Sequence, residues 1–174
     1  VMIDKSSEPY AVNAKEVKEV VDIAHALGIT VEAELGHVGQ AANAEVDTVS
    51  CLTLPEEAKR FVEETGVDCL AVAIGTAHGA YPKGFTPKLD FERLQAIKET
   101  LGANFPLVLH GSSGMDDESL KKACSMGINK VNIATELYEA GAIAASGCVS
   151  GKTKGRLWRI MKDARSEEHT SELQ

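Results

Sequence analysis

The chain has little positive charge, few aromatic residues and no long apolar run. Its 174 residues include 18 lysines and arginines against 26 aspartates and glutamates, a net charge of −8. Without a basic cluster, we expect no nucleic-acid binding. Without an apolar run long enough to cross a bilayer, we expect no membrane association. With 44% hydrophobic, 25% charged and 5% aromatic residues, the composition is that of a soluble globular protein.

Cysteine is scarce, and its four positions are widely spaced: Cys51, Cys69, Cys124 and Cys148. The absence of C-x-x-C excludes zinc-finger and thioredoxin-like proteins. Isolated cysteines of this kind are typical of reduced thiols, so we expect a cytoplasmic protein. No signal-peptide pattern opens the chain, and the first residues, VMID, resemble the interior of a strand.

What is present is an alternation of short apolar runs with amphipathic stretches. The runs predict strands over 1–4, 29–35, 69–75, 106–110 and 128–135. The amphipathic stretches predict helices over 13–27, 55–66, 90–101, 116–127 and 136–146. Strands that are apolar along their length and alternate with helices indicate parallel βαβ units and an α/β fold.

Five βα units without the dinucleotide-binding pattern G-x-G-x-x-G favour a barrel over a Rossmann sheet. A complete TIM (β/α)8 barrel needs about 250 residues, so we expect a partial barrel, about the last five βα units, with the others before Val1. A five-stranded flavodoxin-like sheet, complete at this length, is the alternative. Residues 1–164 are predicted to form one domain. Residues 165–174, RSEEHTSELQ, resemble a translated sequencing adapter and are predicted to be a non-native tail.

Two histidines follow neighbouring strands where those strands end. His78 lies in GTAHG and His110 opens HGSSG one unit later. Active sites of parallel α/β proteins lie at the carboxyl ends of strands, and neutral imidazole is a common zinc ligand. A single histidine of this kind more often closes a loop, but two at neighbouring strand ends are as consistent with a metal site. His25, on a helix, and His37, in a loop, are not expected to be ligands.

Small and hydroxyl residues follow His110 and the next strand. Glycine and serine at 111–114 precede a helix expected near Asp116, and Asn132-Ile133-Ala134-Thr135 precede another. Exposed backbone N–H groups there can bind phosphate on an acidic protein. Each segment alone could be a turn or a strand end; together they favour phosphate binding.

The segments VMID, VEAELG, AIGTAHG, PLVLHGSSG and NKVNIATEL occur in an order and spacing that resemble one family. They are similar to the class II, metal-dependent ketose-bisphosphate aldolases, above all to the tagatose-bisphosphate branch. The resemblance extends from residue 1 to about 145. It implies a C-terminal portion of a barrel that cleaves tagatose or fructose 1,6-bisphosphate into dihydroxyacetone phosphate and glyceraldehyde 3-phosphate.

The resemblance also implies site residues and partners. Zinc is held by three histidines in the family, and two of them match His78 and His110; a monovalent cation can accompany the zinc. The substrate-phosphate site matches Gly79, Gly111, Ser112, Ser113, Asn132, Ile133, Ala134 and Thr135. The third histidine and the proton-transfer aspartate are expected before Val1, so this portion alone should be inactive. The intact protein is expected to be a dimer or tetramer.

Three positions qualify the resemblance. Ser7 stands where the family usually has histidine, and Glu45 is the only candidate for a proton-transfer glutamate in its loop. Glu34 is expected near the metal, where it is equally suited to structural hydrogen bonding and to metal contact. Because the expected acid–base groups are absent while the phosphate segments are present, a non-catalytic sugar-phosphate-binding module is the alternative function.

Overall fold

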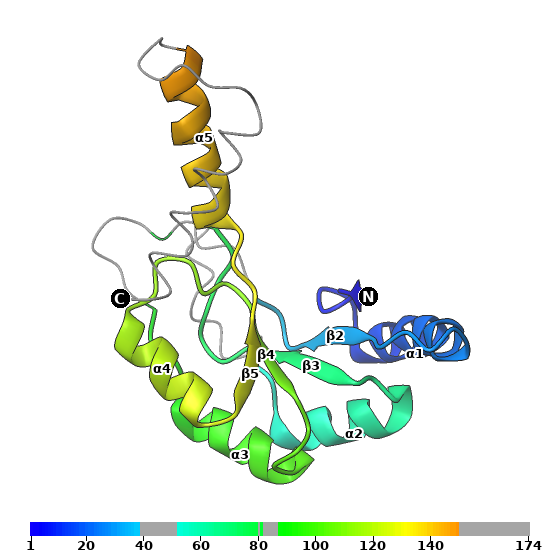
Figure 1. Ribbon diagram of the computed structural model, residues 1–174. Coiled ribbons are helices and arrows are strands. Elements are labelled where there is room, and N and C mark those ends of the chain that lie inside the picture. Colours follow the sequence, from blue (N-terminus) through cyan, green and yellow to red (C-terminus); the bar gives the residue numbers. More distant parts are fainter. Residues whose placement is uncertain (39–51, 80, 82–86, 150–174) are drawn as a thin grey trace. The chain divides into compact units, whose positions relative to one another are not determined.

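Strands and helices alternate along residues 1–38, 52–79, 81 and 87–149, which this computed structural model describes (Figure 1). The strands are β1 (Met2–Ile3), β2 (Glu32–Leu35), β3 (Cys69–Val72), β4 (Leu107–Leu109) and β5 (Ile128–Val131). The helices are α1 (Tyr10–Ala26), α2 (Pro55–Thr65), α3 (Phe91–Leu101), α4 (Asp117–Ser125) and α5 (Thr135–Val149). The chain divides into two units, Val1–Asn132 and Ile133–Gln174, each described here by itself.

The five strands form one parallel sheet in the order β1-β2-β3-β4-β5. Each strand therefore lies beside its neighbour in sequence, as the strands of a (β/α)8 barrel do. A flavodoxin-like sheet has the order 2-1-3-4-5, with the first strand between the second and third. The observed order confirms the barrel-type prediction and excludes the flavodoxin-like alternative.

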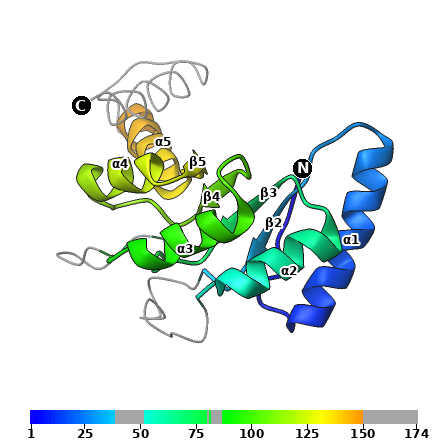
Figure 2. The same cartoon turned by 90° about the horizontal axis from the view of Figure 1, so that it is seen from below.

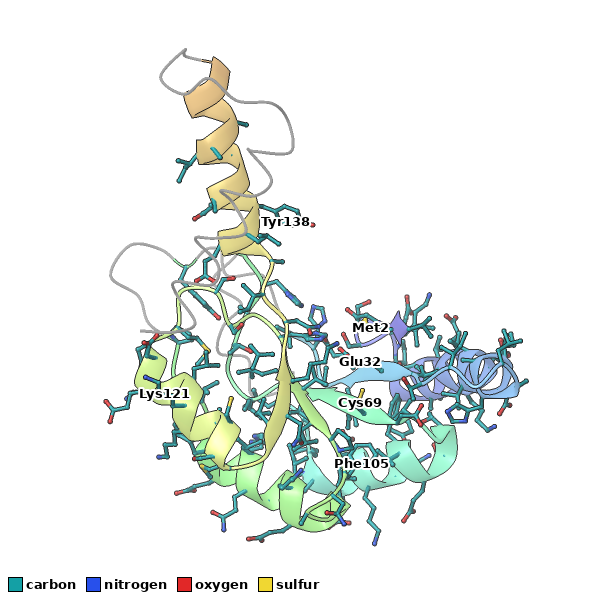
Figure 3. All side chains as sticks on the ribbon, in the orientation of Figure 1. Met2, Glu32, Cys69, Phe105, Lys121 and Tyr138 are labelled. Carbon is teal, nitrogen blue, oxygen red and sulfur yellow. The ribbon has the colours of Figure 1, made fainter. Side chains whose placement is uncertain are left out.

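The two faces of the sheet differ in chemistry. Helices α1 to α4 lie along one face (Figures 1 and 2). That face carries the apolar core, to which the strands contribute Ala33, Leu35, Leu70, Val72, Leu107 and Leu109. Because side chains alternate along a strand, the other face receives the residues between them. Glu32 and Cys69, which are aligned on neighbouring strands, belong to this second face (Figure 3).

The helix ends follow the predicted capping chemistry. Pro55 begins α2, and Gly66 ends it in the left-handed conformation at φ 74°. The carboxylate of Asp90 accepts the Arg93 amide at the start of α3, as the sequence predicts. Leu27, the last residue of the segment predicted to be helical, lies just outside α1, which ends at Ala26, and is 71% exposed.

Several sequence predictions concern residues outside this description. They include those for Cys51, Glu45 and the segment 165–174. Cys69 and Cys124, in the described part, are free thiols. None of the helices between residue 1 and residue 149, in the ranges described, combines the length and the apolar character that a membrane span needs.

Candidate metal centre

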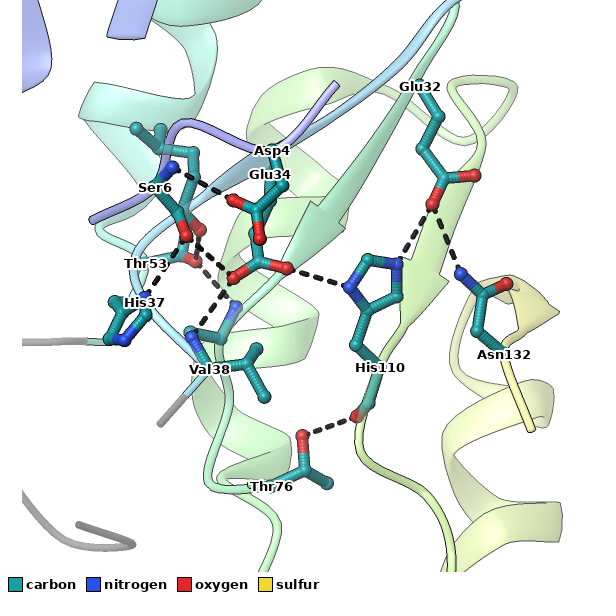
Figure 4. Close-up of polar contacts among 12 residues, drawn as sticks. Asp4, Ser6, Glu32, Glu34, His37, Val38, Thr53, Thr76, His110 and Asn132 are labelled. Atoms are coloured by element: carbon teal, nitrogen blue, oxygen red, sulfur yellow. Dashed lines mark hydrogen bonds and ion pairs between the residues drawn. The ribbon is translucent and has the colours of Figure 1, made fainter. Parts of the chain in front are cut away.

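His110 lies directly after β4 between two carboxylates. Its Nδ1 atom is 2.7 Å from Oε2 of Glu34, and its Nε2 atom is 2.9 Å from Oε1 of Glu32 (Figure 4). All three side chains are buried, with 6% of the His110 side chain exposed and less of the two acids. Both acids come from β2, two residues apart, and therefore lie on the same face of the sheet.

Three of the described side chains can share a metal ion. Glu34, His78 and His110 each offer a ligand atom, and these atoms lie within 4.8 Å of one another. The imidazole rings of His78 and His110 have their centroids 5.8 Å apart. Two imidazoles and a carboxylate form one of the three-ligand sets of catalytic zinc sites, so these residues fit the ion. The predicted pairing of the two strand ends is present, and their metal-binding role stays a prediction.

The charges at the site are strongly coupled. Burial alone would lower the pKa of His110, but the hydrogen bonds and negative charges of Glu32 and Glu34 outweigh it and raise this pKa to about 9. For Glu32, burial opposes ionisation, but His110 and Lys130 lower its pKa to about 2. Burial lowers the pKa of His78. The lowered pKa favours neutral His78, the state in which imidazole binds metals, whereas His110, with its raised pKa, must lose a proton to bind one.

Glu34 is a hydrogen-bonding centre as well as a candidate ligand. Its Oε1 atom accepts the hydroxyl of Ser6 at 2.9 Å and the amide of Val38 at 3.0 Å (Figure 4). The Ser6 hydroxyl also lies 3.2 Å from Nδ1 of His37, and Asp4 accepts the Ser6 amide at 2.9 Å. Both roles left open for Glu34 are therefore compatible with its position, while His37 contacts Ser6 outside the ligand group.

The loops that carry the two histidines are tied together. Thr76 donates its hydroxyl to the carbonyl of His110 at 2.7 Å. The hydroxyl of Tyr81 accepts the Ala77 amide at 2.6 Å and lies 3.1 Å from the carbonyl oxygen of Gly111. Gly111 itself has φ 64°, and a Cβ atom there would lie 2.5 Å from the Ala77 carbonyl oxygen. This contact explains why glycine follows His110.

The predicted phosphate residues of the first unit lie in these same loops. Ser112 and Ser113 are each 7% exposed, and the Ser112 hydroxyl donates to the carbonyl of Asn132 at 3.1 Å. Gly79 adopts φ 90° directly after His78. At the start of α4, Asp116 accepts the Ser119 amide through its own carboxylate. The Ser119 amide is therefore already paired, and the part of these loops in phosphate binding stays a prediction.

The remaining predicted phosphate residues are Ile133, Ala134 and Thr135, which belong to the second unit. There the carbonyl of Ala134 accepts the amide of Tyr138 at 3.0 Å, in the first turn of α5. Their part in phosphate binding stays a prediction.

Sequence reasoning missed two residues that the structure brings to the site. Glu32 was part of VEAELG, but only Glu34 was singled out; the pattern E-x-E on a strand predicts two acids on one face. Tyr81 follows GTAHGA by one residue and carried no separate signal. His25, which is not expected to be a ligand, is exposed, and its Nε2 atom lies 2.9 Å from Oδ2 of Asp68.

A parallel sheet with neighbouring strands in chain order, and with candidate metal ligands following its strands, defines a βα-barrel protein with a candidate metal centre. The chain matches the family model of class II fructose-bisphosphate aldolases over residues 1–170. It therefore belongs to the class II fructose-bisphosphate aldolase family.

Among the solved structures that this chain resembles are several aldolases. The YdjI aldolase from Escherichia coli K12 is 38% identical, with a TM-score of 0.74 over 94% of this chain and 54% of that one. A protein provisionally assigned as a fructose-1,6-biphosphate aldolase from Coccidioides immitis is 33% identical, with a TM-score of 0.77 over 94% and 56%. Fructose-bisphosphate aldolase from Campylobacter jejuni is 27% identical, with a TM-score of 0.68 over 88% and 48%. The chain spans about half the length of these structures.

Proposed function

We propose that this chain carries the metal-binding and phosphate-binding part of a zinc-dependent aldolase. The reaction is the reversible cleavage of a ketose 1,6-bisphosphate, either tagatose or fructose bisphosphate, into dihydroxyacetone phosphate and glyceraldehyde 3-phosphate. The observation that carries the proposal is the grouping of His78, His110 and Glu34 within 4.8 Å in a member of the class II family.

The metal is zinc, held by His78 and His110, with Glu34 beside them as a donor from the same chain. When bound, zinc supplies a Lewis acid that polarises the substrate carbonyl group. The residues of the chain hold and shield this position: Glu34 and His110 are buried, and Thr76 ties the two histidine loops together. A monovalent cation as a further cofactor remains a prediction.

The phosphate of the substrate binds through Gly79, the loop Gly111–Ser113 and Asn132 of the first unit. For Ile133, Ala134 and Thr135 of the second unit, the phosphate-binding role stays a prediction. Support comes from the position of Gly111, which has a left-handed φ of 64° and lies so close to Ala77 that a Cβ atom would meet the Ala77 carbonyl oxygen at 2.5 Å. A loop fixed in this way can present its amides without losing further conformational freedom on binding.

Proton transfer requires an acid that we do not assign within this chain. We propose that an aspartate and a third histidine come from βα units beyond those described here, and that this chain alone is inactive. The cytoplasmic location and the dimeric or tetrameric assembly of the intact protein belong to the same proposal.

Zinc titration of the chain tests the metal assignment. We expect saturable binding that His78→Ala and His110→Ala each abolish, and that His25→Ala, a control on an exposed histidine, leaves unchanged. Fusion of the N-terminal half of a class II aldolase before Val1 should then create chelator-sensitive cleavage of one of the two bisphosphates. Cleavage by the unfused chain would contradict the proposed inactivity, and chelator-resistant cleavage by the fusion would contradict the metal role.

A second function is favoured by the loop Gly111–Ser113, which the Tyr81 hydroxyl connects to Ala77 through hydrogen bonds alone. A non-catalytic module would bind sugar phosphates through this loop alone. Calorimetric titration with dihydroxyacetone phosphate separates the two: saturable binding by a folded monomer in the presence of chelator supports the module, and binding that requires zinc supports the enzyme.

A further inference from the structure

Two acids flank His110, but only one of them belongs to the candidate ligand group. Glu34 faces Nδ1 and lies with His78 and His110 in that group, whereas Glu32 faces Nε2 and lies outside it. Glu32 is buried all the same, with only 4% of its surface exposed. The fold therefore buries an acid that is not a member of the candidate ligand group. Burial of a carboxylate is costly unless the charge is paired, and the pairing of Glu32 therefore indicates its role.

The sheet is built so that Glu32 and Glu34 can reach His110. Strand β3 separates β2 from β4, and neighbouring strands lie about 4.8 Å apart. In the register of the sheet, Ala71 of β3 is aligned with Glu34 on one side and Val108 on the other. Cys69, aligned with Glu32, is also small. The short side chains of β3 leave room for both carboxylates to cross it.

Three residues besides His110 contact the carboxylate of Glu32. Its Oε2 atom pairs with the ammonium group of Lys130, whose side chain is 53% exposed, and lies 3.9 Å from the Cys69 sulfur. Its Oε1 atom, which meets His110, also lies 3.4 Å from the amide nitrogen of Asn132. A carboxylate anchored by three residues of β3, β5 and the turn after β5 has little freedom to rotate.

We propose that Glu32 is a positioning residue that holds the Nε2–H group of His110 and so turns its Nδ1 atom toward the metal. This inference rests on the proposed metal centre. Glu32 touches neither the metal nor the substrate; it acts through the imidazole ring. A ligand histidine whose second ring nitrogen donates to a carboxylate has a fixed tautomer and orientation, and the loss of such a carboxylate typically weakens metal binding about 10–100-fold.

The test uses the chain with Glu32→Gln, which keeps the size of the side chain and removes its charge. Zinc affinity should fall about 10–100-fold. Nitrogen-15 spectra of the zinc-bound wild type should show metal on Nδ1 and a slowly exchanging proton on Nε2 of His110. In Glu32→Gln the Nε2 proton should exchange faster. Glu64→Gln, a matched change at an exposed acid of α2, should alter neither the affinity nor the exchange.

Removal of the ion pair between Lys130 and Glu32 should weaken zinc binding less than removal of the Glu32 charge. Lys130→Met leaves Glu32 in place, so its loss of zinc affinity should be less than that of Glu32→Gln. Circular dichroism of each variant checks that the sheet is retained. If Glu32→Gln does not fold, Glu32→Asp, which keeps the charge but shortens the reach, should still fold and show the faster Nε2 exchange.

Two results would overturn the positioning role: zinc on Nε2 of His110 in the wild type, or Nε2 exchange that no change at Glu32 accelerates. If the wild type binds no zinc, the proposed metal function fails. The exchange measurement then decides the positioning role separately, because Glu32 and His110 are already in contact without the ion.

Discussion

Gly111 joins the two loops of the site at a point where a side chain has no room. Its φ of 64° disfavours any other residue, and an added Cβ would meet the Ala77 carbonyl oxygen at 2.5 Å. Gly111→Ala should therefore lower the free energy of unfolding by about 1–3 kcal/mol, as overpacking does, and weaken zinc binding through the displaced His78 loop. Urea unfolding measures the first effect and zinc titration the second.

Gly28→Ala is the matched control for this change. Gly28 has a similar φ of 69°, but a Cβ there would meet no atom within 4 Å. Gly28→Ala should therefore lower the free energy of unfolding only through the backbone strain at this φ, and it should leave zinc binding unchanged. Equal losses of stability in both variants, with zinc affinity intact, would show that the contact with Ala77 contributes nothing.

Because His110 and Glu32 are coupled, we predict that the free energy of unfolding of the chelator-treated protein depends on pH. The carboxylates of Glu32 and Glu34, opposed by burial, raise the pKa of His110 from 6.5 to about 9. Its stabilising contribution is then complete below pH 6.5 and is lost as the pH rises through 9. The pKa of Glu32 falls from 4.5 to about 2, so its contribution is complete above pH 4.5 and is lost as the pH falls through 2.

Denaturant unfolding between pH 5 and pH 9.5 measures the alkaline part of this effect. The wild type should lose stability above pH 6.5 more steeply than Glu32→Gln, in which one of the two carboxylates that hold the proton on His110 is gone. Parallel curves for the two proteins in this range would contradict the coupling.

The sequence predicted the pair of histidines but not the acids that hold one of them. His78 and His110 could be found because each follows an apolar run, and strand ends converge in parallel sheets. The contact of Glu32 with His110 depends on the register across β3 and on the small side chains there, neither of which can be read from local pattern. The contacts of Tyr81 depend on its position beside Ala77 and Gly111, which no sequence period describes.

At the scale of the elements, the N-terminus of α3 shows how one carboxylate links a helix to its surroundings. Asp90 accepts the Arg93 amide at 2.9 Å and pairs with the Arg93 guanidinium at 3.0 Å. Arg93 in turn donates to the carbonyl of Thr53 at 3.0 Å, just before α2. Asp90→Ala should lower the free energy of unfolding by about 1 kcal/mol, the usual effect of losing an N-cap.

Asp90→Asn serves as the control because asparagine keeps the oxygen that accepts the amide. It should retain most of the stability that Asp90→Ala loses, as measured by thermal or urea unfolding. A loss as large in Asp90→Asn as in Asp90→Ala would assign the effect to the ion pair with Arg93 instead of the cap.

The elements themselves were predictable because their signals are local. Helical spacing, a proline at the start of α2 and a glycine at its end define that helix without reference to the rest of the chain. Strand lengths were less accurate: the segment 128–135 was expected to be a strand, whereas β5 ends at Val131 and α5 begins at Thr135. The amide of Asn132 still donates to the carbonyl of Leu109 at 3.0 Å directly after β5, an extent of pairing that apolar character alone does not reveal.

At the scale of the whole molecule, the edges of the sheet determine how the chain behaves in solution. Among the described strands, β1 and β5 each pair on one side only. Val1 and Met2 of the β1 edge are 64% and 42% exposed, so apolar side chains accompany unpaired backbone groups. Such an edge is a template for pairing with another chain. We therefore predict that this chain associates with itself as its concentration rises.

Sedimentation velocity over a series of concentrations measures this association. Met2→Lys should shift the distribution toward monomer, because a charge on an edge strand disfavours edge-to-edge pairing. Ile143→Lys, a change at an apolar residue of α5 that is 67% exposed, controls for the added charge and should have the smaller effect. Fusion of N-terminal aldolase units before Val1 should suppress the association more strongly than Met2→Lys if a strand of those units pairs with the β1 edge. A chain that stays monomeric at every concentration would show that this edge is already protected.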